Sequence, residues 1–153
     1  MVNSYTYLGY LFTTKLSYKQ GVRMLVTEAK KAVIKSARAL NRLSDISYKT
    51  FFKIFDAQVQ PILLYSSEVW GTQRLDCVER IHTLACKRFL SVPSRTPNLI
   101  VYGELGRHPL YINSCLRCIK YWFKLLEMDD SRLPKQAYNI LVNMDNNEKM
   151  RWA

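Results

Sequence analysis

The segment 19–43 constrains the fold most, because its apolar and basic residues fall on opposite sides of a helix. At about 100° per residue from Lys19, the apolar residues lie between roughly 220° and 340°, and the basic residues lie between about 0° and 160°. Met24 and Ile34 are exceptions on the basic side. The apolar set is Val22, Leu25, Val26, Ala29, Ala32, Val33, Leu40 and Leu43. This spacing predicts one long amphipathic helix that packs against a core.

The basic face of this helix is the candidate binding surface of the chain. Glu28 is the one acidic residue in the segment, and the basic residues are Lys19, Arg23, Lys30, Lys31, Lys35, Arg38 and Arg42. The net charge of +11 is concentrated here, since residues 1–44 hold eight basic residues and one acidic residue. A surface of one sign favours contact with nucleic-acid phosphates. Binding to an anionic membrane surface is a weaker alternative to nucleic-acid contact, and so is a helix face that only meets water.

The remaining patterns predict a mostly α fold, a helical bundle preceded by a short β-strand or hairpin. Residues 1–16 are expected to form the β segment, with an aromatic-rich strand at 5–12 in which Gly9 marks a bulge or a close backbone approach. Residues 17–153 are expected to form the helical domain. Its later helices are expected at 47–60, 75–90, 97–104, 110–127 and 133–142, followed by a frayed polar tail.

Three positions are expected to mark helix boundaries. Ser47 is a candidate N-cap, since its hydroxyl is able to accept a hydrogen bond from the first turn of the following helix. Pro61 is expected to interrupt or restart that helix, because proline lacks the N–H that a helix interior needs. Thr96 is expected to cap a helix whose first turn holds Pro97.

The composition excludes several classes of protein. Hydrophobic residues make up 48% and charged residues 23% of the 153, which is typical of a globular domain and not of a disordered chain. Five Gly and five Pro exclude a collagen-like chain. No run approaches the roughly 18 apolar residues of a membrane span, and the N-terminus does not resemble a secretory signal. We expect an intracellular protein, nuclear or cytoplasmic and not secreted, with reduced thiols.

The residues that carry catalytic or metal chemistry do not form a convincing site. Cys115 and Cys118 form a C-x-x-C, but they lie in a predicted helix, and we expect the cysteines to be buried structural thiols rather than zinc ligands. His108 lies in a Gly- and Pro-containing loop and is expected to be structural. Asp129 and Asp130 are adjacent, but they end a predicted helix, whereas a two-metal site needs carboxylates from neighbouring strands. We expect no catalytic residue, metal or other cofactor in this chain.

The order of several short motifs resembles the reverse transcriptases of non-LTR (LINE-type) retrotransposons. YLGYLF at 7–12 and KLSY at 15–18 resemble the strand pair that follows the catalytic motif in that family. QPILLYSSEVWG at 60–71 is similar to a family signature, with matches at Pro61, Leu63, Leu64, Tyr65, Ser67, Glu68, Trp70 and Gly71. The stretch 75–110 is similar to the sequence that follows, with VPSRTPN, YGELG and Pro109.

The resemblance implies a thumb-like portion of an RNA-directed DNA polymerase that binds a primer–template duplex. The family's catalytic aspartates and the Mg²⁺ they hold belong to the palm, whose motif is not among these residues, so we expect the isolated chain to be inactive. The implied partners are an RNA–DNA or RNA duplex and the remainder of the element polyprotein, with no small-molecule substrate and no membrane. Trp70 is expected to anchor the core.

Two alternatives remain open at this point. The first is a helical protein-interaction module whose contacts run through exposed aromatics such as Tyr121, Trp122 and Phe123. The second is a truncated or decayed element product with no selected activity. Charge and core residues alone do not separate these alternatives from a duplex-binding thumb.

Overall fold

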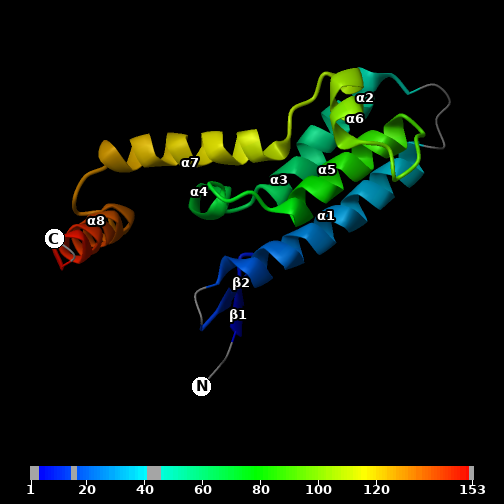
Figure 1. Cartoon of the computed structure of the whole chain (residues 1–153). Coiled ribbons are helices and arrows are strands. Elements are labelled where there is room, and N and C mark those ends of the chain that lie inside the picture. Colours follow the sequence, from blue (N-terminus) through cyan, green and yellow to red (C-terminus); the bar gives the residue numbers. More distant parts are fainter. Residues whose placement is uncertain (1–3, 15–16, 41–45, 152–153) are drawn as a thin grey trace.

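The computed structural model describes residues 4–14, 17–40 and 46–151, without the side chains of 39–40 and 145–151. A two-stranded hairpin precedes a set of helices, which confirms the mostly α fold with an N-terminal β segment (Figure 1). In chain order the elements are β1 (Ser4–Tyr7), β2 (Tyr10–Thr13), α1 (Tyr18–Leu40), α2 (Tyr48–Ile54), the π-helix η1 (Phe55–Val59), α3 (Gln60–Leu63), α4 (Ser67–Trp70), α5 (Asp76–Phe89), α6 (Asn98–Leu105), α7 (Leu110–Leu126) and α8 (Leu133–Arg151). No helix in the described ranges is long and apolar enough to cross a membrane.

The N-terminal segment is a tight hairpin rather than one strand with a bulge. β1 and β2 pair antiparallel, with Tyr7 opposite Tyr10. The two turn residues, Leu8 and Gly9, have φ values of 47° and 79°. A two-residue turn with both central residues left-handed matches the right-handed twist of the strands it joins. The expected bulge or close backbone approach at Gly9 is therefore wrong, because Gly9 supplies the second left-handed position of the turn and no described atom lies within 4 Å of a Cβ added there.

A close approach at Gly21 joins the hairpin to α1. Tyr10 is buried at 7% exposure, and a Cβ added at Gly21 would stand within 3 Å of its ring. The hydroxyl of Tyr10 donates to the carbonyl of Tyr18 at 3.3 Å. Glycine at position 21 thus lets β2 lie directly on the first turn of α1.

The core forms between α1, the stretch 48–63 and α5. On α1 the buried residues include Val22, Leu25, Ala29 and Val33, all from the predicted apolar face. On α5 the buried apolar residues are Val78, Ile81, Ala85 and Cys86. The periodicity of 19–43 therefore predicted the packing face of α1 correctly.

The stretch 48–63 is helical throughout, with a π segment ahead of its proline. Ser47 caps it as predicted, since its hydroxyl accepts from the Thr50 N–H at 3.2 Å. In η1 the Gln60 N–H bonds to the carbonyl of Phe55, one residue further back than in an α-helix. The wider turn accommodates Pro61, which has no N–H to donate, so the helix changes its hydrogen-bond pattern instead of ending.

Two predicted boundaries are wrong. α6 begins at Asn98 with Pro97 at its N-cap position and no side-chain cap, so Thr96 does not cap it; the Thr96 N–H instead closes a turn onto Pro93 at 3.0 Å. α8 extends to Arg151, well beyond the expected end at Val142. Pro134 lies in the first turn of α8, and no Gly or further Pro follows to stop the helix.

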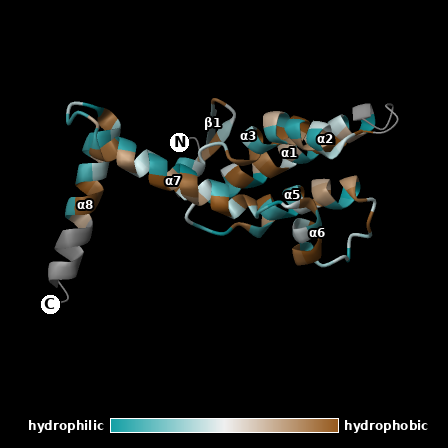
Figure 2. Ribbon diagram, turned by 90° about the horizontal axis from the view of Figure 1, so that it is seen from above, coloured by the Kyte–Doolittle hydropathy of each residue, from teal (hydrophilic) through white to brown (hydrophobic). Residues whose placement is uncertain are grey.

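Helices α7 and α8 form an arm that projects from the core. The first part of α7 packs against α4, and the rest extends away from the core helices (Figure 1). Figure 2 shows α8 leaving the far end of α7 in a different direction, so that the two helices form a bent arm. Trp122 and Tyr138 join them through a hydrogen bond of 3.1 Å between Nε1 and the hydroxyl.

Candidate nucleic-acid interface

The exposed side of α1 carries the predicted basic residues together. Six of the seven lie on the surface, namely Lys19, Arg23, Lys30, Lys31, Lys35 and Arg38. Arg42 lies outside the described residues. α1 has 23 residues, which gives a length of about 34 Å at 1.5 Å per residue. The helix therefore presents a continuous row of positive charge over a distance comparable to one turn of a nucleic-acid duplex.

Little negative charge opposes this row. Lys31 pairs with Glu28 at 2.7 Å, and the two side chains are 68% and 52% exposed. Water and salt screen so exposed a pair, and pairs of this kind contribute little to stability. Within the described part of the chain, this is the one ion pair that α1 forms. The surface of α1 thus keeps a strong positive field.

Contacts along its length hold α1 in place. Near the start of α1, the hydroxyl of Tyr18 donates to Gln73 Oε1. Near its end, Ser36 Oγ donates to Gln58 Oε1 at 3.2 Å. Between them the apolar face is buried in the core. The basic side chains are consequently displayed on a fixed helix, as contact with a regular phosphate backbone requires.

The segment 60–71 forms the junction between the core and the arm. Trp70 is buried at 2% exposure, and its Nε1 donates to the carbonyl of Tyr65 at 3.2 Å, so the predicted core anchor is confirmed. A Cβ on Gly71 would stand 2.6 Å from the carbonyl oxygen of Ser114. Ser114 Oγ also donates to the carbonyl of Gly71 at 3.0 Å. Glycine at 71 thus allows α4 and α7 to touch through their backbones.

The thiols of the C-x-x-C pair serve the same junction. Cys118 Sγ donates to the carbonyl of Ser67 at 3.0 Å, and Cys115 Sγ donates to that of Gly71 at 3.4 Å. Cys86 is fully buried in the core, as expected of a structural thiol, whereas Cys77, Cys115 and Cys118 are half-buried. In the ranges that the structure describes, no three His, Cys, Asp or Glu side chains converge as metal ligands would.

A buried polar cluster at the base of the arm was not predicted from the sequence. Glu79 on α5 accepts hydrogen bonds from Tyr102 Oη and from the backbone N–H groups of Leu110 and Tyr111, the latter two at 3.3 and 3.4 Å. His82 Nδ1 lies 3.3 Å from the same carboxylate. Leu110 and Tyr111 are the first residues of α7, so a side chain from α5 caps the arm helix.

The electrostatics of this cluster indicate a structural role. Burial acts to raise the pKa of Glu79, but hydrogen bonds from His82 and Tyr102 hold that pKa below its usual value. Burial together with the bond to Glu79 raises the pKa of Tyr102. The cavity beside Glu79 has a volume of only about 10 Å³, too small for a substrate. The cluster therefore holds an ionised carboxylate at a helix terminus and does not form an active site.

The adjacent aspartates lie in the turn between α7 and α8. Asp129 Oδ1 accepts the Ser131 N–H at 2.8 Å, and Asp130 Oδ1 accepts from Asn139 at 3.3 Å. Both aspartates are exposed. The two aspartates thus lie in a turn at the end of a helix, as the sequence predicted. Their placement does not fit a two-metal site, which needs carboxylates converging from neighbouring strands.

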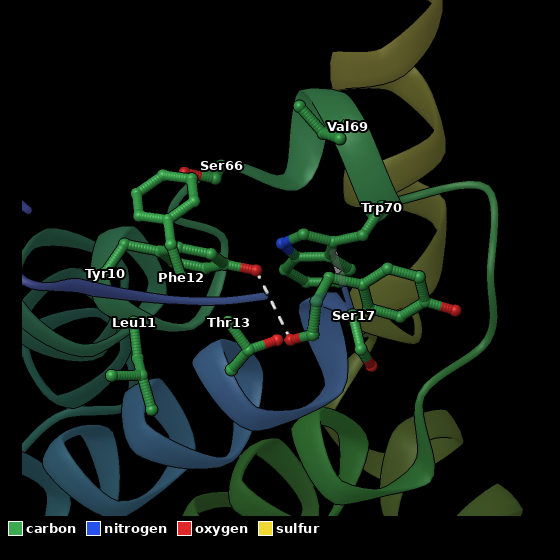
Figure 3. Close-up of a pocket in the computed structure, with 9 residues that line it drawn as sticks. Tyr10, Leu11, Phe12, Thr13, Ser17, Ser66, Val69 and Trp70 are labelled. Atoms are coloured by element: carbon green, nitrogen blue, oxygen red, sulfur yellow. Dashed lines mark hydrogen bonds between the residues drawn. The ribbon is translucent and has the colours of Figure 1, made fainter. Parts of the chain in front are cut away.

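An apolar hollow lies beside the N-terminal end of α1. It has a volume of about 240 Å³ and lies between β2 and α4, with Phe12, Val69 and Trp70 in its lining (Figure 3). Thr13, Ser17 and Ser66 are the small polar residues among the described lining. None of the described residues that line this hollow is charged, so their side chains suit an apolar group rather than a phosphate.

Comparisons of the chain with protein-family models, with curated proteins and with solved structures found no match. The geometry of α1 and the order of the sequence motifs are therefore the grounds for the functional proposal.

Proposed function

We propose that this chain is the duplex-binding, thumb-like portion of a non-LTR retrotransposon reverse transcriptase. In this proposal α1 lies along the sugar–phosphate backbone of an RNA–DNA or RNA duplex. The observation that carries it is the single exposed basic face of α1, supported on its other side by the core. The resemblance of the segments 7–18 and 60–110 to that family adds the polymerase context.

The chemistry of α1 suits binding without sequence preference. Lysine and arginine side chains that contact phosphates hold a duplex in register but read no bases. An A-form duplex offers its phosphates and 2′-hydroxyls rather than base edges to such a surface. A template-copying enzyme must bind every sequence alike, so contacts of this kind fit a thumb.

We assign no catalytic centre and no metal to this chain. The family's Mg²⁺ would be held by the palm aspartates, and the one adjacent aspartate pair here does not fit such a site. The polymerase reaction is proposed only for the larger protein to which a thumb of this kind belongs, and this chain's share is to hold the duplex.

A salt titration of duplex affinity tests the proposal. If about four phosphates are contacted, log affinity should fall against log salt with a slope of roughly −3.6. Replacing Lys30, Lys31 and Lys35 by Gln should flatten that slope by up to about 2.7, because each lysine displaces about one counterion. The matched control replaces three exposed basic residues on other helices, Arg80, Lys120 and Lys124. Equal slopes for both triple variants would remove α1 from the binding surface.

A second candidate function is a protein-interaction module on the arm. Apolar residues of α7 form an exposed stripe at alternating spacings of four and three, comprising Ile112, Leu116, Ile119, Phe123 and Leu126. Each is between 43% and 53% exposed. Trp122, at 45% exposed, lies beside the stripe, whereas Tyr121 is half-buried. Exposed apolar stripes of this length are typical of surfaces that receive a partner helix.

The charges of α7 specify the partner for this second function. Within α7 the charged residues are Arg117, Lys120 and Lys124, all basic. A second copy of α7 would bring like charges together, so the favoured partner is an amphipathic helix with acidic residues beside its apolar stripe. A helical peptide whose leucine stripe is flanked by Glu should bind at least about fivefold more tightly than the same peptide with Lys in place of Glu. Equal affinity of the two peptides, read from Trp122 fluorescence, would reject the module.

A further inference from the structure

A hollow of about 520 Å³ lies beside the C-terminal half of α1, where α1 meets α2 and the end of α5. Its volume falls in the range of roughly 300–1,000 Å³ that is usual for small-ligand sites. The described residues that line it are Ile34, Ala37 and Arg38 of α1, Phe51 of α2, Arg88 of α5 and Ser91 of the following turn. The hollow therefore continues the basic face of α1 onto other elements of the fold.

Two arginines from distant parts of the chain border this hollow. Arg38 and Arg88 are both exposed, and neither forms an ion pair within the described ranges. Two guanidinium groups around one space repel each other, and an anion between them converts that repulsion into attraction. Guanidinium donors also match the oxygens of phosphate in geometry. The pair thus favours a phosphate rather than a neutral ligand.

Ser91 adds a hydroxyl to the same hollow at a position where glycine is usual. The Val92 N–H bonds to the carbonyl of Lys87 at 3.1 Å, and the Ser91 N–H bonds to that of Arg88 at 3.2 Å. These bonds form the C-terminal motif in which a left-handed residue ends the helix, and Ser91 has a φ of 53°. Serine in this left-handed backbone conformation is strained, whereas glycine would not be. Ser91 also adds a hydrogen-bond donor to the residues that line the hollow.

The remaining wall is apolar and firmly packed. Phe51 is half-buried, with its ring centroid 5.1 Å from that of Phe89 and 5.0 Å from that of Phe52. Ile34 is also half-buried, which accounts for an apolar residue on the basic side of α1. A cationic rim beside an aromatic wall suits a nucleotide, whose phosphate is anionic and whose base and sugar present apolar surface.

We infer that this hollow binds one internal phosphate of a nucleic-acid strand between Arg38 and Arg88, with the attached nucleoside against Phe51. The Ser91 hydroxyl donates to the same phosphate. This inference rests on the proposed function and extends it, because Arg88 and Ser91 lie outside α1 and were not among the predicted contacts. It makes the end of α1 a defined phosphate site rather than one more point on a charged face.

Arginine variants test the site with a short RNA–DNA hybrid whose ends carry hydroxyls. Arg88→Gln should weaken binding about fivefold at roughly 0.1 M salt. The control Arg80→Gln, which removes another exposed arginine of the same helix, should change the affinity less than about twofold. Because both arginines hold one phosphate, the double variant of Arg38 and Arg88 should flatten the salt slope by about 0.9 rather than about 1.8. Circular dichroism melts should be unchanged in all variants. Equal effects of Arg88→Gln and Arg80→Gln, or a double-variant change near 1.8, would overturn the inference.

Two further measurements separate this site from the proposed function. If the lysine triple variant weakens hybrid binding and Arg88→Gln does not, the phosphate site is rejected and the function of α1 stands. If the parent protein binds no hybrid, the side-chain Nε–H resonances of Arg38 and Arg88 are followed by NMR during titration with AMP. Shifts with AMP but not with adenosine support the phosphate site independently of duplex binding. Absence of shifts with AMP, or equal shifts with adenosine, rejects it.

Discussion

Arg107 donates its Nε–H to Nε2 of His82 at 3.0 Å. Because Nε2 accepts this bond, the ring proton of neutral His82 lies on Nδ1, which faces Glu79 at 3.3 Å. On its other side the Arg107 guanidinium pairs with Asp56 at 2.6 Å and lies 4.4 Å above the ring of Phe52. One chain of contacts therefore joins η1, α5 and the loop before α7, and it ends at the carboxylate that caps the arm.

Glu79→Gln should destabilise the protein by about 2 kcal/mol, because the amide group does not satisfy every donor that the carboxylate accepts. An amide offers one acceptor oxygen, and its NH₂ group would face further donors from His82, Tyr102 and the start of α7. Urea unfolding measures the change. The control Glu104→Gln, exposed on α6, should stay within about 0.5 kcal/mol of the parent. Equal stability of the two variants would show that Glu79 does not hold the arm.

Acid should remove the contribution of Glu79 to stability. Its pKa is lowered from 4.5 in the folded chain, because its hydrogen bonds outweigh the effect of burial. A carboxyl group with a lowered folded pKa stabilises the fold above its unfolded pKa, and that stabilisation is lost as pH falls through the folded value. The difference in unfolding free energy between the parent and Glu79→Gln should therefore shrink as pH falls below about 4.5. Urea titrations at a series of pH values measure it, and a constant difference down to about pH 3 would contradict the assignment.

The sequence predicted the features that depend on local periodicity. The 3.6-residue repeat of 19–43 predicted both faces of α1, and Ser47 was correctly identified as a cap because capping involves residues only three positions apart. A hairpin was among the expectations, but the position of its turn was missed, because the turn places Leu8, a residue that rarely adopts a left-handed conformation, at its first position. The pairing of β1 with β2 imposes that conformation on Leu8, and the local preference of leucine does not indicate it.

The features that depend on distant residues had no sequence signal. Glu79 caps a helix that begins 31 residues later, and Arg38 and Arg88 border one hollow although 50 positions separate them. Neither spacing matches a helical or strand repeat, so only the packing of α1, α5 and α7 brings these groups together. His82 illustrates the same limit, since its two partners lie three and 25 residues away.

Cys86 should resist alkylation in the folded protein. Burial raises its pKa to about 12, so at pH 8 only about one molecule in ten thousand carries the reactive thiolate, and that thiolate is enclosed by the core. Iodoacetamide at pH 8, followed by peptide mass spectrometry, should leave Cys86 unmodified until urea unfolds the chain. Rapid modification of Cys86 without urea would mean that the α5 core opens readily.

Gly71→Ala should separate the arm from the core. The new Cβ would stand 2.6 Å from the Ser114 carbonyl oxygen and closer still to that of Ser67, and backbone atoms of two helices do not move aside as a flexible side chain does. We expect a loss of about 3 kcal/mol or more, together with weaker protection of the Ser114 region from hydrogen exchange.

Gly103→Ala is the matched control. Gly103 lies inside α6 with nothing within 4 Å of an added Cβ, so alanine should stabilise the protein by up to about 1 kcal/mol through its better helix propensity. If the two substitutions change the free energy of unfolding in opposite directions, close backbone packing, and not glycine flexibility, sets the requirement at Gly71. A mild effect of Gly71→Ala would instead mean that α4 and α7 are not in backbone contact.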